Sequence, residues 1–231
     1  MTYVKIFQMK TAQGRVEEIF LDGSAGIVCP PELIPHPGQY LHAHADGSVS
    51  PLAVSLFPSL ISPKGFRSAP AAPPLWRPGD ILHLRGPIGR GFFIPANARR
   101  IALVAFDDSP SLLRGLIPVA VKQNAEVVLA CDSQIADLPE VVEVQPLEAM
   151  GEILRWADYA AFDADRENLN RLRERLAGMN QAGAGIAAQV LIRAAMPCGG
   201  IADCGACALI LRHEWKMICK DGPVFDLRGI K

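Results

Sequence analysis

The sequence of 231 residues has no long apolar run and no excess of charge of one sign. No run reaches the roughly 18 apolar residues that a membrane-spanning helix needs, so we expect no transmembrane helix. The formal net charge is −1, which argues against a nucleic acid or an anionic membrane surface as the partner. Residues 1–10 alternate like a strand and lack the apolar core of a signal peptide, so we expect a cytoplasmic protein.

Cysteine is sparse in most of the chain and concentrated near its end. Cys29 and Cys131 are isolated, whereas the other four cysteines lie within the last 34 residues with the spacing C-x5-C-x2-C-x11-C. In a reducing cytoplasm, such a cluster is more typical of a metal site than of disulfides. The candidate ligands are Cys198, Cys204, Cys207 and Cys219.

The residues between these cysteines favour an iron–sulfur cluster. Its irons need soft thiolate ligands, and the loop around it must bring backbone N–H groups close to the sulfurs. Glycine allows that approach, and Gly199, Gly200 and Gly205 lie within the cysteine segment. The spacing is close to the plant-type C-x4-C-x2-C pattern with a distant fourth cysteine. We predict a 2Fe–2S cluster, with a four-cysteine zinc site as the alternative.

Short strand-like runs punctuated by proline and glycine fill residues 1–98, which predicts a small β-barrel. Residues 3–9 and 15–21 are predicted as two strands joined by a turn at TAQG. Residues 58–78 hold six prolines, and we expect an extended loop there because central strands do not tolerate such a density. The further predicted strands are GIVC, QYLHAHA, PLAVSLF and DILHLRG.

Residues 99–182 are predicted to form an α/β domain with a parallel sheet. RIALVAF and EVVLACD are continuous apolar runs, as expected for strands buried on both faces. Residues 109–123 are a weaker helix candidate, and 166–177 the clearest helix, because three leucines recur on one of its faces. Residues 183–231 then form the predicted cluster-binding domain, which begins with a strand at about 187–193. The predicted fold class is therefore mixed β and α/β.

Three features of the tail resemble a known family. Met196 stands two residues before the first cysteine of the cluster, a glycine-rich loop follows, and C-x-DGPVF begins at Cys219. These features resemble the cluster-binding end of the electron-transfer subunit of class B dihydroorotate dehydrogenase. GQYL (38–41) and GDILHLRGPIGRGFFIP (79–95) also resemble barrel landmarks of that family. The resemblance implies a ferredoxin reductase-like fold with an FAD barrel, an NAD domain and a C-terminal 2Fe–2S domain, in that order.

Two stretches depart from that family. Its flavin motif pairs an arginine with a small hydroxyl residue, whereas PLAVSLFPS (51–59) has no arginine and offers Ser55 as the hydroxyl. The resemblance thus implies FAD binding with Ser55 as a contact, whereas the missing arginine argues against FAD binding. FDDSPS (106–111) and AFDADREN (161–168) replace the glycine run and the nicotinamide segment of the NAD site. Carboxylates there would repel phosphates, so we do not expect NAD.

The histidines add no further ligand set. His42 and His44 alternate on one predicted strand, and we interpret them as a solvated strand face because two histidines alone make a poor metal site. His213 lies between Cys207 and Cys219, but four cysteines complete the ligand set without it.

The sequence therefore predicts an electron-transfer protein that carries a 2Fe–2S cluster and works with a redox partner protein, such as a flavin-containing catalytic subunit. We expect an oxidoreductase-like subunit rather than a stand-alone enzyme, with Ile201 at the tip of the cysteine loop facing the partner. One alternative is a functional FAD and 2Fe–2S subunit of dihydroorotate dehydrogenase. Another is a scaffold whose cluster or zinc ion only ties down the tail.

Overall fold

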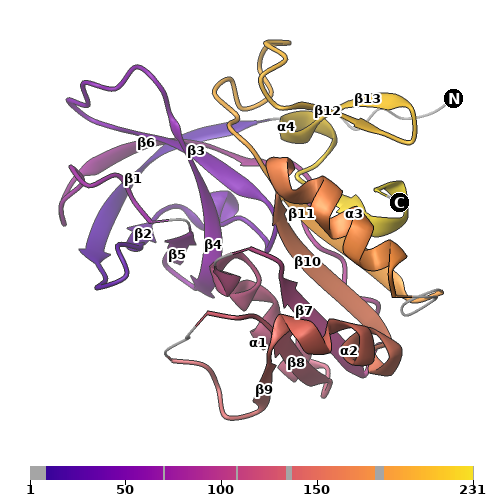
Figure 1. The fold of residues 1–231 in the computed structure, drawn as a ribbon. Coiled ribbons are helices and arrows are strands. Elements are labelled where there is room, and N and C mark those ends of the chain that lie inside the picture. Colours follow the sequence, from indigo (N-terminus) through magenta and orange to yellow (C-terminus); the bar gives the residue numbers. More distant parts are fainter. Residues whose placement is uncertain (1–8, 70, 108, 134–136, 180–184, 231) are drawn as a thin grey trace, which may run out of the picture.

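The structure is a computed structural model, and it describes residues 9–69, 71–107, 109–133, 137–179 and 185–230. A barrel, an open sheet and a small C-terminal hairpin follow one another along the chain (Figure 1). None of the helices within these ranges has the length and apolar character needed to cross a membrane.

The N-terminal part is a closed antiparallel barrel with the strand order β1-β2-β5-β4-β3-β6 (Figure 1). Val16, Leu41, Leu56 and Leu84 are among the side chains that form its core, since alternate residues of each strand face inward. The predicted barrel is confirmed. Its strands are β1 (Lys10–Ile19), β2 (Ala25–Val28), β3 (Tyr40–Ala45), β4 (Val54–Ser62), β5 (Gly65–Ala69) and β6 (Ile81–Ile88).

The turn predicted at TAQG is wrong. These four residues lie inside β1, which pairs with β6 along its first half. Gly14 packs so closely on β6 that a Cβ there would lie 2.5 Å from Leu84 Cδ1. The glycine therefore marks a close approach of two strands and not a turn. The strand predicted at 3–9 falls outside the described residues except for Met9.

The extended loop predicted at 58–78 is wrong for its first half, because β4 and β5 form a hairpin there. Pro58 lies in β4 where the register with β5 shifts, between Pro58 and Leu60. Strands tolerate proline at such irregularities, because a ladder hydrogen bond is already interrupted. Pro63 lies in the hairpin turn, and residues 71–78 lie in a loop, as predicted.

The middle of the chain forms an open sheet with the order β14-β11-β10-β7-β8-β9. Neighbours from β11 to β9 pair in parallel, and β14 runs antiparallel to β11. The order along the chain reverses between β7 and β10, and this switch point is where open α/β sheets form ligand crevices. The strands are β7 (Arg100–Ala105), β8 (Glu126–Ala130), β9 (Val142–Gln145), β10 (Tyr159–Asp165), β11 (Ala187–Arg193) and β14 (Val224–Asp226).

Helices cover both faces of this sheet. Ala102 and Val104 of β7 share a core with α2 and α3, whereas Ile101 and Leu103 share another with α1. Burial on both faces explains why RIALVAF is continuously apolar. The helices are α1 (Ile117–Lys122), α2 (Met150–Trp156), α3 (Leu169–Ala177) and α4 (Ile218–Asp221). Short 3-10 helices span Pro31–Leu33, Pro110–Leu112, Arg114–Leu116, Leu147–Ala149, Arg166–Asn168 and Leu227–Gly229.

Two predicted helices have different outcomes. The helix predicted at 109–123 shrinks to 3-10 turns followed by α1, with Pro118 in its first turn, where a missing N–H costs nothing. The helix predicted at 166–177 is confirmed, starting as a 3-10 turn and continuing as α3.

The C-terminal segment adds the hairpin of β12 (Ala208–Leu211) and β13 (Glu214–Met217), then α4 and β14. Leu209, Leu211 and Ile218 belong to the same core as α2 and α3. Because β11 and β14 are strands of the large sheet, the tail is continuous with the α/β layer. The domain boundaries at 98 and 182 stay predictions.

Candidate metal centre

The four clustered cysteines lie on two segments that the hairpin brings together. Cys198 and Cys204 are in the loop after β11, Cys207 directly precedes β12, and Cys219 lies in α4 just after β13. Pairing of β12 with β13 brings the last two side by side, and Ile218 N donates to the carbonyl oxygen of Cys207 at 3.1 Å.

The thiols form two pairs. Cys198 Sγ lies 3.5 Å from Cys204 Sγ, and Cys207 Sγ lies 3.2 Å from Cys219 Sγ. Two thiolates on one tetrahedral metal with bonds of about 2.3 Å lie about 3.7 Å apart, so each pair is close to what one metal ion requires. Among the described residues, no three His, Cys, Asp or Glu side chains converge on one single-ion position. Two thiol pairs with these spacings fit a two-iron cluster with two thiolates per iron.

Electrostatics differ between the two pairs. Burial alone would raise the pKa of Cys198, but backbone hydrogen bonds at Gly200 and Ala202 outweigh it and bring that pKa down to about 7. Burial, together with neighbouring Cys207, raises the pKa of Cys219 to about 12. Metal ligation requires thiolates, so the loop supplies one thiol that ionises readily, and α4 supplies one that a metal must deprotonate.

The two pairs also differ in burial. Cys207 and Cys219 are 1% and 2% exposed, Cys198 is half-buried and Cys204 is exposed. The barrel helps to cover the deep pair, because Tyr40, fully buried at the start of β3, donates its hydroxyl to the carbonyl oxygen of Cys219 at 3.4 Å. One side of the site is thus sealed by the core and the other faces solvent.

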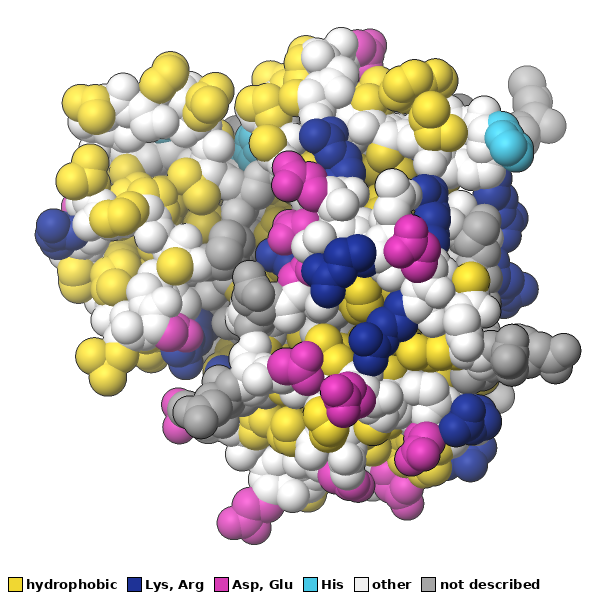
Figure 2. Space-filling view, viewed as in Figure 1, with side chains coloured by type: hydrophobic (Ala, Val, Ile, Leu, Met, Phe, Trp, Pro, Cys, Tyr) yellow, Lys and Arg dark blue, Asp and Glu magenta, His cyan; other side chains and the backbone are white. Residues whose placement is uncertain are grey.

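The solvent-facing side carries apolar side chains. Ile201 in the loop and the cross-strand neighbours Ile210 and Trp215 of the hairpin are 66%, 52% and 69% exposed. Apolar side chains gather at the top of the molecule in Figure 2, where Figure 1 places the hairpin. The tip position predicted for Ile201 agrees with its exposure.

The histidine interpretation is wrong in part. His42 is only 4% exposed, because the cysteine loop covers that part of β3. His44 is partly exposed, and its Nε2 lies 2.9 Å from the carbonyl oxygen of Ser50. Burial and the charge of Arg85 lower the pKa of His42 to about 4, so its ring is neutral. His213 lies in the two-residue turn between β12 and β13, with φ +68°.

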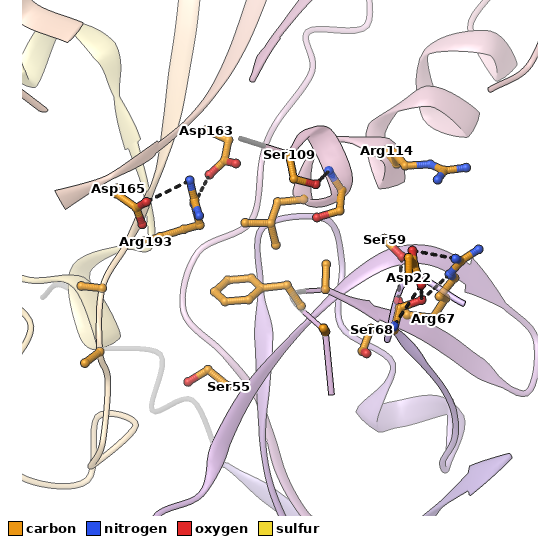
Figure 3. A pocket seen from close by; sticks show the side chains of 18 of the residues that line it. Asp22, Ser55, Ser59, Arg67, Ser68, Ser109, Arg114, Asp163, Asp165 and Arg193 are labelled. Carbon is orange, nitrogen blue, oxygen red and sulfur yellow. Dashed lines mark hydrogen bonds and ion pairs between the residues drawn. The ribbon is translucent and has the colours of Figure 1, made fainter. Parts of the chain in front are cut away.

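A cleft of about 670 Å³ separates the barrel from the α/β sheet. This volume is in the range of small-molecule sites. Phe57 and Leu112 line this cleft. Ser55 lines it as well, so the predicted flavin contact faces a cavity (Figure 3). Sequence reasoning missed the two arginines that line the barrel end, Arg67 on β5 and Arg114.

These arginines are already engaged. Arg67 donates to Asp22 Oδ2 at 2.8 Å and to Ser24 Oγ at 2.6 Å, and its guanidinium stacks on the Phe20 ring (Figure 3). Arg114 donates to the carbonyl oxygen of Asp137 at 2.7 Å. A flavin diphosphate would have to compete with these partners for both cations.

Acidic residues fill the switch point of the sheet. Arg193, the last residue of β11, donates to Asp163 Oδ1 at 2.9 Å and lies 3.3 Å from Asp165 Oδ2 (Figure 3). It also donates to Asp107 Oδ2 at 3.0 Å. The segment after β7 continues into a three-residue 3-10 helix that begins with Pro110. Among the described residues, this edge lacks the glycine turn that cradles a dinucleotide phosphate and carries the carboxylates of Asp107, Asp163 and Asp165 instead.

A comparison with known protein families finds a match for the C-terminal segment. Residues 194–231 match the family described as "Iron-sulfur cluster binding domain of dihydroorotate dehydrogenase B". This segment contains all four clustered cysteines. No curated protein sequence matches the chain.

Solved structures show the fold of the whole chain. A structure of an NADH-dependent reduced ferredoxin-NADP oxidoreductase, reported for flavin-based electron bifurcation, aligns with TM-score 0.72 and 15% identity over 95% of this chain and 90% of that one. The ferredoxin reductase of carbazole 1,9a-dioxygenase aligns with TM-score 0.58 and 14% identity, covering 77% and 68%. The Amycolatopsis cytochrome P450 reductase GcoB gives 0.57 and 12%, covering 80% and 71%. The chain therefore has a ferredoxin reductase-like fold, and its C-terminal segment is similar to the iron–sulfur cluster binding domain of dihydroorotate dehydrogenase B.

Proposed function

We propose that this chain is an electron-transfer protein that holds a 2Fe–2S cluster and exchanges electrons with a partner protein. The observation that carries the proposal is the pairing of four thiols, at 3.5 Å and 3.2 Å, inside the segment that matches a cluster-binding family. The proposed ligands are Cys198, Cys204, Cys207 and Cys219. We also propose a cytoplasmic location, because a reducing compartment keeps cysteines as free thiols.

Such a cluster supplies one-electron transfer. The residues of the chain determine where that transfer can occur. The hairpin and Tyr40 exclude water from Cys207 and Cys219, whereas Cys204 reaches the surface beside Ile201. Electrons would therefore pass through the exposed side of the loop, where a partner can approach.

NAD is not part of the proposed function. Arg193 is the cation nearest the switch point, and three carboxylates already surround it. A phosphate there would face the carboxylates of Asp107 and Asp165, and Arg193 would offset little of their charge because it is already paired with three carboxylates. The chain would then depend on other proteins as electron donor and acceptor.

The test is the metal and sulfide content of the anaerobically purified chain. We expect about two irons and two acid-labile sulfides per chain, with the broad visible absorption of a 2Fe–2S centre. Cys204→Ser should bleach this absorption. Cys131→Ser is the matched control, since Cys131 is buried in the core between the sheet and α1. Stoichiometric zinc without labile sulfide would instead support the scaffold alternative.

A second candidate function retains the flavin. The observation that favours it is the cleft beside Phe57 and Ser55, which has the volume for a flavin ring. In that case the chain would be an FAD and 2Fe–2S subunit that relays electrons to a dihydroorotate dehydrogenase catalytic subunit. Acid release of FAD from the purified chain, and its loss in a Phe57→Asp variant that keeps its iron, would establish this function. Protein without releasable flavin would leave the cluster as the sole centre.

A further inference from the structure

One arginine of the barrel reaches the backbone of the cysteine loop. Arg85 Nη2 donates to the carbonyl oxygen of Cys198 at 3.0 Å, and Nη1 donates to that of Gly199 at 3.0 Å. These residues are more than 110 positions apart in the chain (sequence separations of 113 and 114). Nη1 also lies 2.9 Å from Met9 Sδ. The guanidinium thus spans two consecutive carbonyls, one of which belongs to a proposed ligand.

A histidine fixes the position of this guanidinium. Arg85 and His42 face each other in the register of β6 and β3, and Arg85 Nη2 lies 3.1 Å from His42 Nδ1. Arginine has only donors, so Nδ1 must accept and Nε2 must carry the ring proton. His42 is 4% exposed and cannot swing away without opening the interface.

The loop is shaped to accept this pair. Gly199 has φ +51°, and a Cβ added there would lie 2.3 Å from Arg85 Nη2 and 2.5 Å from His42 Cε1. Any side chain at this position would push the loop off the barrel. Glycine is therefore required here by the close approach of His42 and Arg85, in addition to its conformational freedom.

The charge of Arg85 has no acidic partner among the described residues, since none of their ion pairs includes it. Its contacts are two carbonyls, a histidine ring and a thioether. A guanidinium stays positive in any protein environment. An uncompensated positive charge beside the thiol loop stabilises negative charge placed on that loop.

We propose that Arg85 is a positioning residue that pins the cysteine loop to the barrel and, through its charge, raises the reduction potential of the centre held there. The part of this inference that concerns the reduction potential rests on the proposed function, whereas the part that concerns the position of the loop does not. Reduction adds one negative charge to the centre, so a nearby fixed cation favours the reduced state. The barrel thereby tunes a site whose ligands all lie in the C-terminal segment.

The experiment compares two substitutions that separate charge from hydrogen bonding. Arg85→Gln removes the charge and keeps donors, and Arg85→Lys keeps the charge and loses the two-carbonyl fork. Arg15→Gln is the control, because Arg15 is an exposed barrel arginine on β1. Midpoint potentials come from titrations of the iron-loaded proteins followed by electron paramagnetic resonance. We expect Arg85→Gln to lower the equilibrium constant for reduction about tenfold, equivalent to about 59 mV for one electron, and Arg85→Lys to recover most of it.

Hydrogen exchange tests the pinning independently of iron. In the metal-free chain, amides of residues 196–205 should exchange several-fold faster in Arg85→Gln than in wild type or Arg15→Gln. Unchanged exchange, or a potential shift as large in Arg15→Gln as in Arg85→Gln, would overturn the inference. Wild-type protein without iron and sulfide would refute the proposed function, and the exchange comparison would still decide whether Arg85 holds the loop.

Discussion

Replacing Arg193 with methionine should destabilise the protein in a pH-dependent way. The guanidinium lies within 3.3 Å of three carboxylates, of which Asp163 and Asp107 have side chains only 1% and 5% exposed. Methionine retains much of the side-chain volume but leaves these carboxylates without their cation. Breaking a buried ion pair by removing one partner costs about 3–5 kcal/mol, because the remaining charge stays buried.

Protonation can relieve part of that cost. Burial raises the pKa of Asp163 to about 7 even with Arg193 present, and its Oδ2 has no hydrogen-bond partner among the described residues. An unfolded aspartate ionises near pH 4, so the folded protein binds the extra proton. The stability that this group contributes is therefore complete below about pH 4 and is lost as pH rises through about 7. Without Arg193 the folded pKa rises further, and the loss continues to higher pH.

Thermal unfolding at pH 5.5 and pH 8.5 measures both effects. At pH 8.5 we expect Arg193→Met to lower the Tm by roughly 6–20 °C, taking about 2–4 °C per kcal/mol for a chain of this size. At pH 5.5 the decrease should be clearly smaller. Adding Asp163→Asn to Arg193→Met should remove most of the difference between the two pH values. Arg100→Met, which breaks the exposed pair with Asp158, should change little at either pH. An equal decrease at both pH values would refute the assignment of the pH dependence to Asp163.

Three further predictions concern cofactor, partner and packing. Isothermal titration with NADH should show no binding below about 1 mM, because Arg193 and the three aspartates paired with it fill the switch point. Micromolar binding would contradict this prediction. Ile201→Lys should keep its iron and sulfide but weaken co-purification with a redox partner, since Ile201 is 66% exposed beside Cys204; full partner binding would exclude the loop tip as the contact. Gly222→Ala should destabilise the tail by about 1–3 kcal/mol, because a Cβ there would lie 2.3 Å from the Phe225 ring. Gly229→Ala is the control and should unfold like wild type, because a Cβ added at Gly229 would have no neighbouring atom within 4 Å.

The cysteine site was the part of the molecule best suited to prediction from sequence. Three of its four proposed ligands lie within ten residues of one another, from 198 to 207, with glycines between them. Local spacing therefore carried most of the information. The barrel was predicted from its short strand-like runs, but the order of its strands was not, because it depends on pairings between distant segments.

The errors in the barrel arose where tertiary contacts overrode local preference. Gly14 and Pro58 are both turn-forming residues that lie in strands here. Gly14 is there because Leu84 of β6 leaves no room for a side chain, and Pro58 because the pairing of β4 with β5 is already irregular. In both cases the residue type alone indicates a turn, and only the pairing with the partner strand explains its place in a strand.

The interpretation of His42 failed for a similar reason. Its strand was correctly predicted, but the surface that covers it comes from a loop more than 150 residues later in the chain. Alternation distinguishes the two faces of a strand but does not say what packs on the outer one. The contact of Arg85 with the cysteine loop could not be predicted for the same reason. Its two acceptors are main-chain carbonyl oxygens, which every residue has, so the residue types do not indicate them.

The switch point shows how topology could have closed part of this gap. The sequence indicated that the phosphate-binding glycines are replaced by FDDSPS, yet it did not indicate what balances those carboxylates. Parallel strands end at the same edge of a sheet, so residues that follow β7, β10 and β11 must meet there once the strand order is known. Asp107 follows β7, Asp163 lies near the end of β10 and Arg193 ends β11, and the two aspartates pair with the arginine across 86 and 30 positions of sequence. An arginine at the end of one buried strand, with aspartates at the ends of its neighbours, is therefore a signal for an ion-pair cluster at the switch point.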